Sequence, residues 1–211
     1  MANTMTPSTK TTKLATDRQI EKAAANYRAM LVKHASEFDA KAMQTALGQP
    51  GLTNQQFALF RKFVEAVAKM IIRVVAINRH REPMEAIKAT GRNFYGDQAV
   101  VKAMPRGEGD EVKVTFFKPD PSNRGGLISD ADLEKEYEAL GLKPADPISV
   151  AAVNEADPAF ADEHPNGTHW QNAEGQWCYA AFDRWNGERD VRVILNGSEW
   201  RGFWWFAGVR K

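Results

Sequence analysis

The sequence predicts an α+β protein in which a helical N-terminal part, residues 16–104, precedes a part of mixed strands and helices, residues 105–211. Three observations support this division. Apolar residues recur at helical spacing in the first part, whereas short runs of β-forming residues between turn residues dominate the second. Residues 1–109 carry 17 Lys and Arg against 9 Asp and Glu, whereas residues 110–211 carry 11 against 18. All six tryptophans lie in the last 42 residues.

Composition restricts the classes of function. The chain has 211 residues, of which 43% are hydrophobic and 26% charged, as is typical of a globular protein. No apolar run reaches about 18 residues, so we expect no membrane insertion. Residues 1–15 have no hydrophobic segment and resemble a disordered tail more than a transit peptide, and the absence of a secretory signal favours the cytoplasm or a virus particle. The single Cys178 excludes an internal disulfide and a multi-cysteine zinc site.

Helical periodicity dominates the first part. Thr16 or Asp17 is a suitable N-cap for a first helix with one apolar stripe. A second, short helix is expected from Ser36 to about residue 47, where Gly48 ends it. Thr53 begins the strongest predicted helix, because apolar residues recur every three or four positions as far as Asn78 without Gly or Pro. The sequence thus predicts one long helix that ends near residue 81.

Shorter elements follow. Pro83 begins a short helix that Gly91 ends, and Ser129 caps a helix over residues 130–140 that Gly141 closes. A further helix is expected from Pro147 to about residue 153. The predicted strands are residues 111–117, 176–182, 190–195 and 203–209, and the turns between the last three contain Asn186-Gly187 and Asn196-Gly197.

The strand at residues 190–195 displays an unusual outer face. Because side chains alternate along a strand, Val191 and Val193 share the core face, whereas Arg192 and Ile194 point outward. An isoleucine displayed beside an arginine is not typical of a solvated strand. These two residues are therefore candidates for contact with a ligand, although an ordinary variable surface would give the same pattern.

The polar loop after this strand is enclosed by tryptophans. Trp200 is expected to anchor the loop to the core, so that Arg201, Gly202 and Phe203 lie between this anchor and Trp204. Rigidly supported surfaces of mixed polarity are typical of binding faces. The alternative is that the six tryptophans only fill the core of a small domain, as we expect for Trp170, Trp177 and Trp204.

From about Asp146 to Lys211, the chain resembles the variable proteins of diversity-generating retroelements, which end in a C-type-lectin fold shared with formylglycine-generating enzymes. The matching segments are Asp157–Phe160, Gly167–Trp170, Trp177–Phe182, Arg184–Gly187 and the terminal Trp204–Lys211. The resemblance implies a C-type-lectin-like domain over residues 105–211 with a variable region at about residues 183–203. It also implies a non-catalytic protein that recognises variable macromolecular ligands, such as another protein.

In that family, sequence varies where template adenines are miscopied, typically at Asn codons. Changes at those adenines cannot produce Trp, Glu, Lys, Gln or Met. We therefore assign the tryptophans, Trp185 among them, to a constant frame that does not vary in sequence. The predicted ligand-binding residues are Asn186, Gly187, Arg192, Ile194, Gly197, Ser198, Arg201, Gly202 and Phe203.

A lectin-fold enzyme related to formylglycine-generating enzymes is one alternative. Those enzymes use a pair of cysteines, whereas this chain has only Cys178, which we expect to be buried and inert. His164 and His169 match no standard metal motif. No cofactor is predicted. A structural calcium ion would find oxygen ligands in Asp157, Asp162 and Glu163, but these residues lack an ordered ligand spacing.

Nucleic-acid binding through the basic helical part is the second alternative. Cations gather at residues 73–81, where the dipole of the predicted long helix would also favour them. No zinc finger or recognition-helix pair accompanies them. The opposite charges of the two parts also suit docking on each other or on a partner. The apolar helix faces favour a role of the helical part in an oligomer or a larger assembly.

Overall fold

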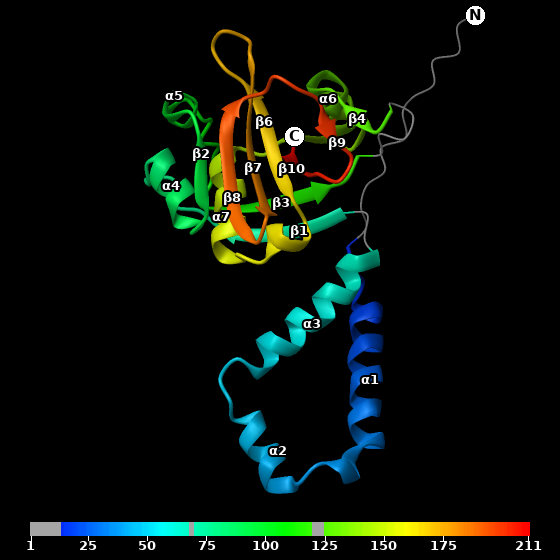
Figure 1. The fold of residues 1–211 in the computed structure, drawn as a ribbon. Helices are drawn as coiled ribbons and strands as arrows, with labels where there is room; N and C mark the ends of the chain where they lie inside the picture. Colours follow the sequence, from blue (N-terminus) through cyan, green and yellow to red (C-terminus); the bar gives the residue numbers. More distant parts are fainter. Residues whose placement is uncertain (1–13, 68–69, 120–124) are drawn as a thin grey trace, which may run out of the picture. The chain divides into compact units, whose positions relative to one another are not determined.

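The computed structural model describes residues 14–67, 70–119 and 125–211 and confirms an α+β protein with a large sheet. The chain divides into two compact units, residues 12–68 and a second unit that contains residues 69–211 (Figure 1). Residues 70–104, which we expected in the helical part, therefore belong to the unit that contains the sheet. The predicted tail, residues 1–15, lies almost wholly outside the described residues.

The described residues of the helical unit, 14–67, form the α-helices α1 (Asp17–Lys33), α2 (Ala40–Leu47) and α3 (Leu52–Val67). Thr16 forms a capping box with Gln19 at the start of α1, and Gly48 is the C-cap of α2, both as expected. The second helix begins later than predicted, because a 3₁₀ turn, η1 (Ala35–Glu37), precedes it.

The long helix predicted from Thr53 to the basic cluster is wrong. Helix α3 ends at Val67, and strand β1 (Met70–Ala76) follows. In β1 the side chains of Ile71, Arg73 and Val75 are buried, which is an alternation with period two. A continuous run of apolar β-branched residues fits the helical spacing of three and four residues as well as the strand spacing of two. Pairing with β3 makes this segment a strand.

The second unit contains an eight-stranded sheet in the order β1-β3-β10-β6-β7-β8-β2, with β5 paired to β10. The β10–β6 and β8–β2 pairs are parallel and the others antiparallel. The strands that follow β1 in this sheet are β2 (Asn93–Gly96), β3 (Glu111–Phe117), β5 (Leu142–Pro144), β6 (Asn166–Gln171), β7 (Trp177–Trp185), β8 (Glu188–Leu195) and β10 (Trp205–Arg210). A separate pair joins β4 (Leu127–Ile128) to β9 (Trp200–Arg201).

The sheet separates two apolar clusters. Adjacent residues of one strand belong to different clusters. Phe116 and Ala207 lie in the larger cluster, whereas Phe117 and Phe206 lie in the smaller one. The larger cluster packs against helices α4 (Pro83–Ala89), α5 (Gln98–Lys102), α7 (Pro147–Ala156) and α8 (Phe160–Glu163), and the smaller against α6 (Asp130–Ala139). Figure 1 shows α7 and α6 on different sides of the strands.

Several local predictions are confirmed. Strand β3 has the predicted bounds, and Ser129 caps α6 by accepting a hydrogen bond from the Asp132 amide. Asn186 and Gly187, with φ of 50° and 87°, form the two-residue turn between β7 and β8. In contrast, Gly197 has no positive φ and lies in an open loop. Strands β2, β5 and β6 and helices α5 and α8 were not predicted.

Candidate functional site

The candidate site begins on the β7–β8 hairpin. Val191 and Val193 are fully buried in the core, whereas Arg192 and Ile194 are half-buried on the opposite face, which confirms the predicted alternation. The register places Tyr179 opposite Ile194 and Ala181 opposite Arg192 on that same face. The hairpin therefore supplies a rigid base of paired strands with Arg192 at its centre.

The loop after β8 completes a hollow of about 300 Å³ above this base. Strand β9 follows the loop, and a turn closed by a hydrogen bond from the Trp204 amide to the Arg201 carbonyl leads into β10. The hollow is lined by Tyr179, Asp183, Trp185, Arg192, Asn196, Ser198, Glu199, Trp200, Arg201, Phe203 and Trp204. We call this set the hairpin–loop face.

Trp200 lies at the floor of this face and is the centre of its aromatic support. Its ring makes edge-on contacts with Tyr179, Trp204 and Phe206, at centroid distances of 5.0, 5.8 and 5.0 Å. Only 5% of Trp200 is exposed, so it anchors the loop to the core as predicted. Phe203, by contrast, is 44% exposed and lies against Trp204. Phe203 is therefore an outward-facing aromatic ring on a buried aromatic base.

Asp130, at the start of α6, ties both ends of the loop to the core. Its Oδ2 accepts a hydrogen bond from Asn196 Nδ2 at 2.6 Å, and its Oδ1 accepts one from Trp200 Nε1 at 2.9 Å. The Asn196 side-chain oxygen in turn accepts a bond from the Ser198 amide. One buried carboxylate therefore fixes residues 196 and 200, between which Gly197 and Ser198 are displayed.

His169 holds this carboxylate from the side of the sheet. Its Nδ1 lies 2.7 Å from Asp130 Oδ1, and its Nε2 lies 2.9 Å from a Glu134 oxygen. The ring stacks on Trp177 and on Tyr137, at 4.6 and 5.7 Å. Burial alone would lower the pKa of His169, but the hydrogen bonds to the two carboxylates outweigh it and raise this pKa.

The pKa of Asp130 is shifted in the opposite direction. Burial alone would raise it, but hydrogen bonds from His169, Trp200 and Asn196 favour the charged form and lower it. The pair is therefore a histidinium and a carboxylate over the pH range between the two pKa values. This charge pair stabilises the base of the loop and does not itself line the hairpin–loop face.

Arg192 is held in place by carboxylates of the same hairpin. One guanidinium nitrogen lies 2.9 Å from Asp183 Oδ2, and the other lies 3.9 Å from Asp190 Oδ2. Both aspartates are buried, whereas about a third of the Arg192 side chain is exposed. Its guanidinium is thus pre-oriented, and the exposed part remains accessible to a ligand.

The structure brings together four of the nine predicted binding residues, since Arg192, Ser198, Arg201 and Phe203 line one hollow. Gly197 and Gly202 adjoin these residues in the chain, and Ile194 lies two residues after Arg192 on the same face of β8. Asn186 and Gly187 lie apart at the hairpin tip, and Gly187 lines a different depression with Arg184 and Glu188.

The tryptophans do not all lie in the core. Trp170, Trp200 and Trp204 are buried, and Trp177 and Trp205 are partly buried. Trp185, which we placed in the constant frame, is instead 61% exposed and lines the hairpin–loop face. Its position next to the hairpin turn explains the difference, because β7 extends beyond the core there.

Sequence reasoning missed Asp130, Tyr179, Asp183 and Asn196. Asp130 is 66 residues from Asn196 and 70 from Trp200 in the chain, so no local pattern links them. The alternation in β7 could have indicated Tyr179 and Asp183, because they share a strand face with Trp185.

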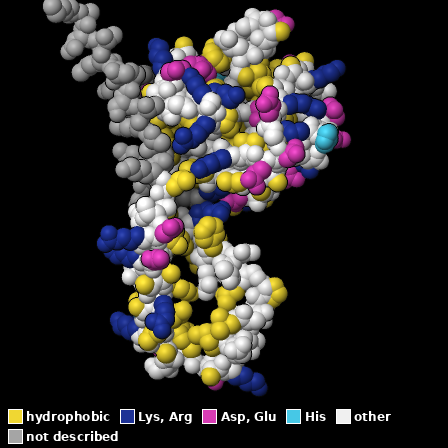
Figure 2. Space-filling model, turned by 180° about the vertical axis from the view of Figure 1, so that it is seen from behind, with side chains coloured by type: hydrophobic (Ala, Val, Ile, Leu, Met, Phe, Trp, Pro, Cys, Tyr) yellow, Lys and Arg dark blue, Asp and Glu magenta, His cyan; other side chains and the backbone are white. Residues whose placement is uncertain are grey.

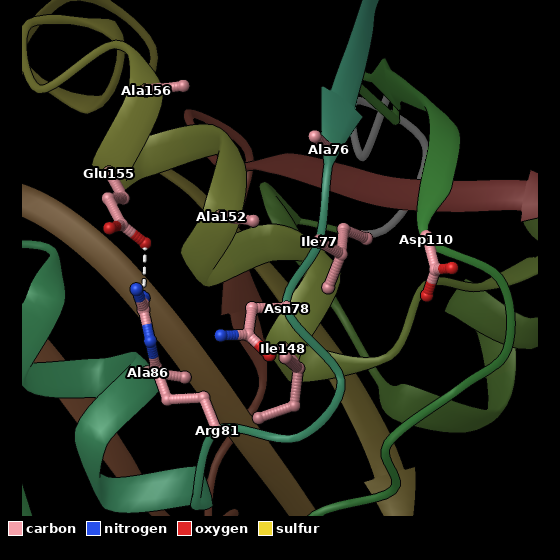
Figure 3. Close-up of a pocket in the computed structure, with 10 residues that line it drawn as sticks. All are labelled: Ala76, Ile77, Asn78, Arg81, Ala86, Asp110, Ile148, Ala152, Glu155 and Ala156. Atoms are coloured by element: carbon pink, nitrogen blue, oxygen red, sulfur yellow. Dashed lines mark hydrogen bonds and ion pairs between the residues drawn. The ribbon is translucent and has the colours of Figure 1, made fainter.

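Two larger hollows lie elsewhere on this unit. One, of about 550 Å³, has a floor of small and aliphatic residues of β1, α4 and α7, and Figure 3 shows Arg81 and Glu155 directed toward each other at its edge. Their ion pair is 2.6 Å long. The other, of about 640 Å³, is bordered by Glu134, His169 and Trp177. In the second hollow, Glu134 contacts His169 Nε2 at 2.9 Å.

The residues considered for metal binding have other partners. Asp162 accepts hydrogen bonds from Arg189 through both of its oxygens, and Asp157 lies 3.7 Å from Arg73. Within residues 14–67, 70–119 and 125–211, no group of three or more His, Cys, Asp or Glu side chains could hold a metal ion. The Cys178 thiol is buried, and burial raises its pKa, which disfavours the reactive thiolate.

The basic cluster at residues 73–81 is not at a helix end. Arg73 is buried in β1, Arg79 pairs with Asp146 at 2.7 Å, and Arg81 pairs with Glu155. The ion pairs join basic residues of the first half of the sequence to acidic residues of the second half, within one unit. The arginines on which the nucleic-acid hypothesis rests are therefore already paired with carboxylates. In the described parts of the chain, no helix is long and apolar enough to cross a membrane.

Comparison with known proteins gives no assignment. No protein-family model, no curated protein and no solved structure matches this chain.

Proposed function

We propose that this chain is a variable protein of a diversity-generating retroelement and that its hairpin–loop face binds a macromolecular ligand without catalysing a reaction. In this proposal the second unit is a C-type-lectin-like domain. The observation that carries the proposal is the convergence of Arg192, Ser198, Arg201 and Phe203 on one hollow. All four are residue types that miscopied adenines of an Asn codon can produce.

The chemistry of the face suits recognition of a protein surface. Arg201 is exposed and can donate charge-assisted hydrogen bonds, and Phe203 offers an apolar ring. Ser198 supplies a small hydroxyl at the tip of the loop. Because Asp130 and Trp200 fix the loop, binding would require little ordering of the backbone, which favours affinity.

The backbone also suits sequence variation. A Cβ added at Gly197 would meet no atom within 4 Å, and its φ is an ordinary one, so many side chains fit there without strain. Gly187, in contrast, has φ of 87°, and other residues would strain the hairpin turn. Among the predicted positions we therefore propose that variation concentrates in the loop at residues 197–203 and on the outward face of β8.

The DNA that surrounds the gene tests this proposal without knowledge of the ligand. We expect a reverse transcriptase gene and a near-copy of the last ~100 nucleotides of the coding sequence, with differences confined to adenines of the copy. The differences should fall in the codons of Arg192, Ser198 and Arg201 and should spare those of Trp200 and Trp204. A complete genome with no such copy, or a copy whose differences fall equally on the tryptophan codons, would contradict the proposal.

A further inference from the structure

The helical unit lacks a core of its own. Among the residues between 14 and 67 whose burial is described, no side chain is buried. Large apolar side chains remain 38–77% exposed, namely Leu14, Ile20, Tyr27, Met30, Leu31, Val32, Phe38, Leu47, Phe57, Leu59, Phe60, Phe63 and Val64. Figure 2 shows hydrophobic side chains gathered around an opening within this unit. Helices ordered without burial do not offset their loss of conformational entropy, so this surface requires a partner.

Helix α3 shows how much surface is uncovered. At 3.6 residues per turn, the apolar residues of α3 cover an arc of about 160° around the helix axis, with Leu59 at one edge and Phe57 at the other. This arc is wider than the ~100° stripe of a helix with one apolar neighbour. Within the chain, α3 is tied to α1 by a hydrogen bond from Gln56 to the Tyr27 hydroxyl. That contact leaves Phe63 77% exposed. The remaining part of the arc is an apolar surface open to a partner.

The uncovered area is large enough for a stable interface. If each of the large apolar residues contributes about 100 Å², the unit exposes on the order of 1,000 Å² of apolar surface, against the ~800 Å² per partner of a standard interface. Interfaces of this apolar character are typical of permanent homo-oligomers. Residues 14–67 carry seven Lys or Arg and five Asp or Glu, so copies of the unit do not repel one another strongly.

The charges of α1 indicate which partner fits. Glu21 and Arg28 lie two turns apart on the same flank of the stripe formed by Ile20, Tyr27 and Leu31. In an antiparallel pair of α1 helices related by a twofold axis, Glu21 of each copy faces Arg28 of the other, and small residues lie at the centre between them. Both charged side chains are exposed.

We propose that the helical unit is a homodimerisation module in which α1 packs antiparallel against α1 of a second copy and α3 completes the apolar interface. The module is independent of the ligand proposed for the hairpin–loop face. A dimer presents two such faces on one particle, which raises the avidity for a ligand that displays repeated epitopes.

Sedimentation equilibrium of the full chain at about 1–100 µM tests the proposal. We expect a mass of about 47 kDa, twice the 23.6 kDa of one chain. Ile20→Glu should raise the dissociation constant at least 100-fold, because it places a charge in the apolar stripe. Ala25→Glu, on the polar side of the same helix, is the matched control and should leave it unchanged within about threefold.

Charge reversal distinguishes the antiparallel arrangement from other partners. Glu21→Arg and Arg28→Glu should each raise the dissociation constant about tenfold, and the double variant should restore it to within about threefold. Because all six tryptophans lie in the second unit, their fluorescence reports that this unit stays folded in every variant. A monomeric wild-type chain at 100 µM, an Ile20→Glu variant that dimerises like the control, or a double variant without restoration would overturn the proposal.

Discussion

Replacement of Asp130 by Asn tests the idea that one buried carboxylate fixes the loop of the hairpin–loop face. The substitution keeps the shape of the side chain but removes its charge and turns one acceptor into a donor. The new amide nitrogen would face the Asn196 amide, which now donates to Oδ2 at 2.6 Å. Rotation of the Asn196 amide would relieve the conflict but would break its bond from the Ser198 amide.

The expected cost follows from the partners that are lost. Hydrogen bonds to a charged group contribute about 1.5–3 kcal/mol each, and removal of one member of a buried ion pair costs about 3–5 kcal/mol. Glu134 still contacts His169 and limits the loss. We therefore expect Asp130→Asn to reduce the free energy of unfolding of the second unit by about 3–5 kcal/mol, or about 10 °C in Tm.

Tryptophan fluorescence and circular dichroism at pH 6 measure this change, since the tryptophans lie in the second unit. Asp110→Asn is the matched control, because it makes the same chemical change at an exposed carboxyl. Its Tm should change by less than about 2 °C. Hydrogen exchange at the Ser198 and Trp200 amides should accelerate in Asp130→Asn alone. Equal Tm values for the two variants would refute the role of Asp130.

Two further predictions concern the support of the site. The folded-state pKa of His169 is raised, so the stability that its ion pair gives the fold is complete below the ordinary histidine pKa of about 6.5. This stability is lost as the pH rises through the folded-state pKa. His169→Gln should therefore lower the Tm more at pH 5.5 than at pH 9, and a difference independent of pH would argue against the ion pair. Gly167→Ala should lower the free energy of unfolding by about 1–3 kcal/mol, because the new Cβ would lie 2.8 Å from the Ala180 carbonyl oxygen. Gly197→Ala should change the free energy of unfolding by no more than about 0.5 kcal/mol. Urea denaturation of the two alanine variants measures the difference, and equal costs would show that the loop is not open at Gly197.

The elements that sequence reasoning predicted well are those with local causes. The Asn186-Gly187 turn follows from the tolerance of both residues for positive φ, and the alternation of Val191 and Arg192 follows from strand geometry. Ser129 caps α6 through its own side chain and the amide three residues later. Each of these interactions lies within a few residues of chain.

The elements that were missed have distant causes. Strand β1 was assigned to a helix because its β-branched residues fit both periods, and only the pairing of Met70 with Phe117, 47 residues later, decides between them. Asp130 and His169 likewise meet across 39 residues. Trp185 was placed in the constant frame because miscopied adenines cannot produce tryptophan, and this argument does not reveal that the strand carrying it extends past the core.

The division between a fixed frame and a displayed face is the central claim, and two displayed libraries of the full chain test it most directly. One library randomises Arg192, Ser198, Arg201 and Phe203, and the other randomises the same number of frame positions, including Trp200 and Trp204. We expect most clones of the face library to remain folded, with tryptophan fluorescence like that of the parent, and to yield binders to an immobilised folded probe protein such as streptavidin. The frame library should lose folded clones and yield no binders. Equal loss of folded clones in both libraries, or a folded face library without binders, would contradict the account.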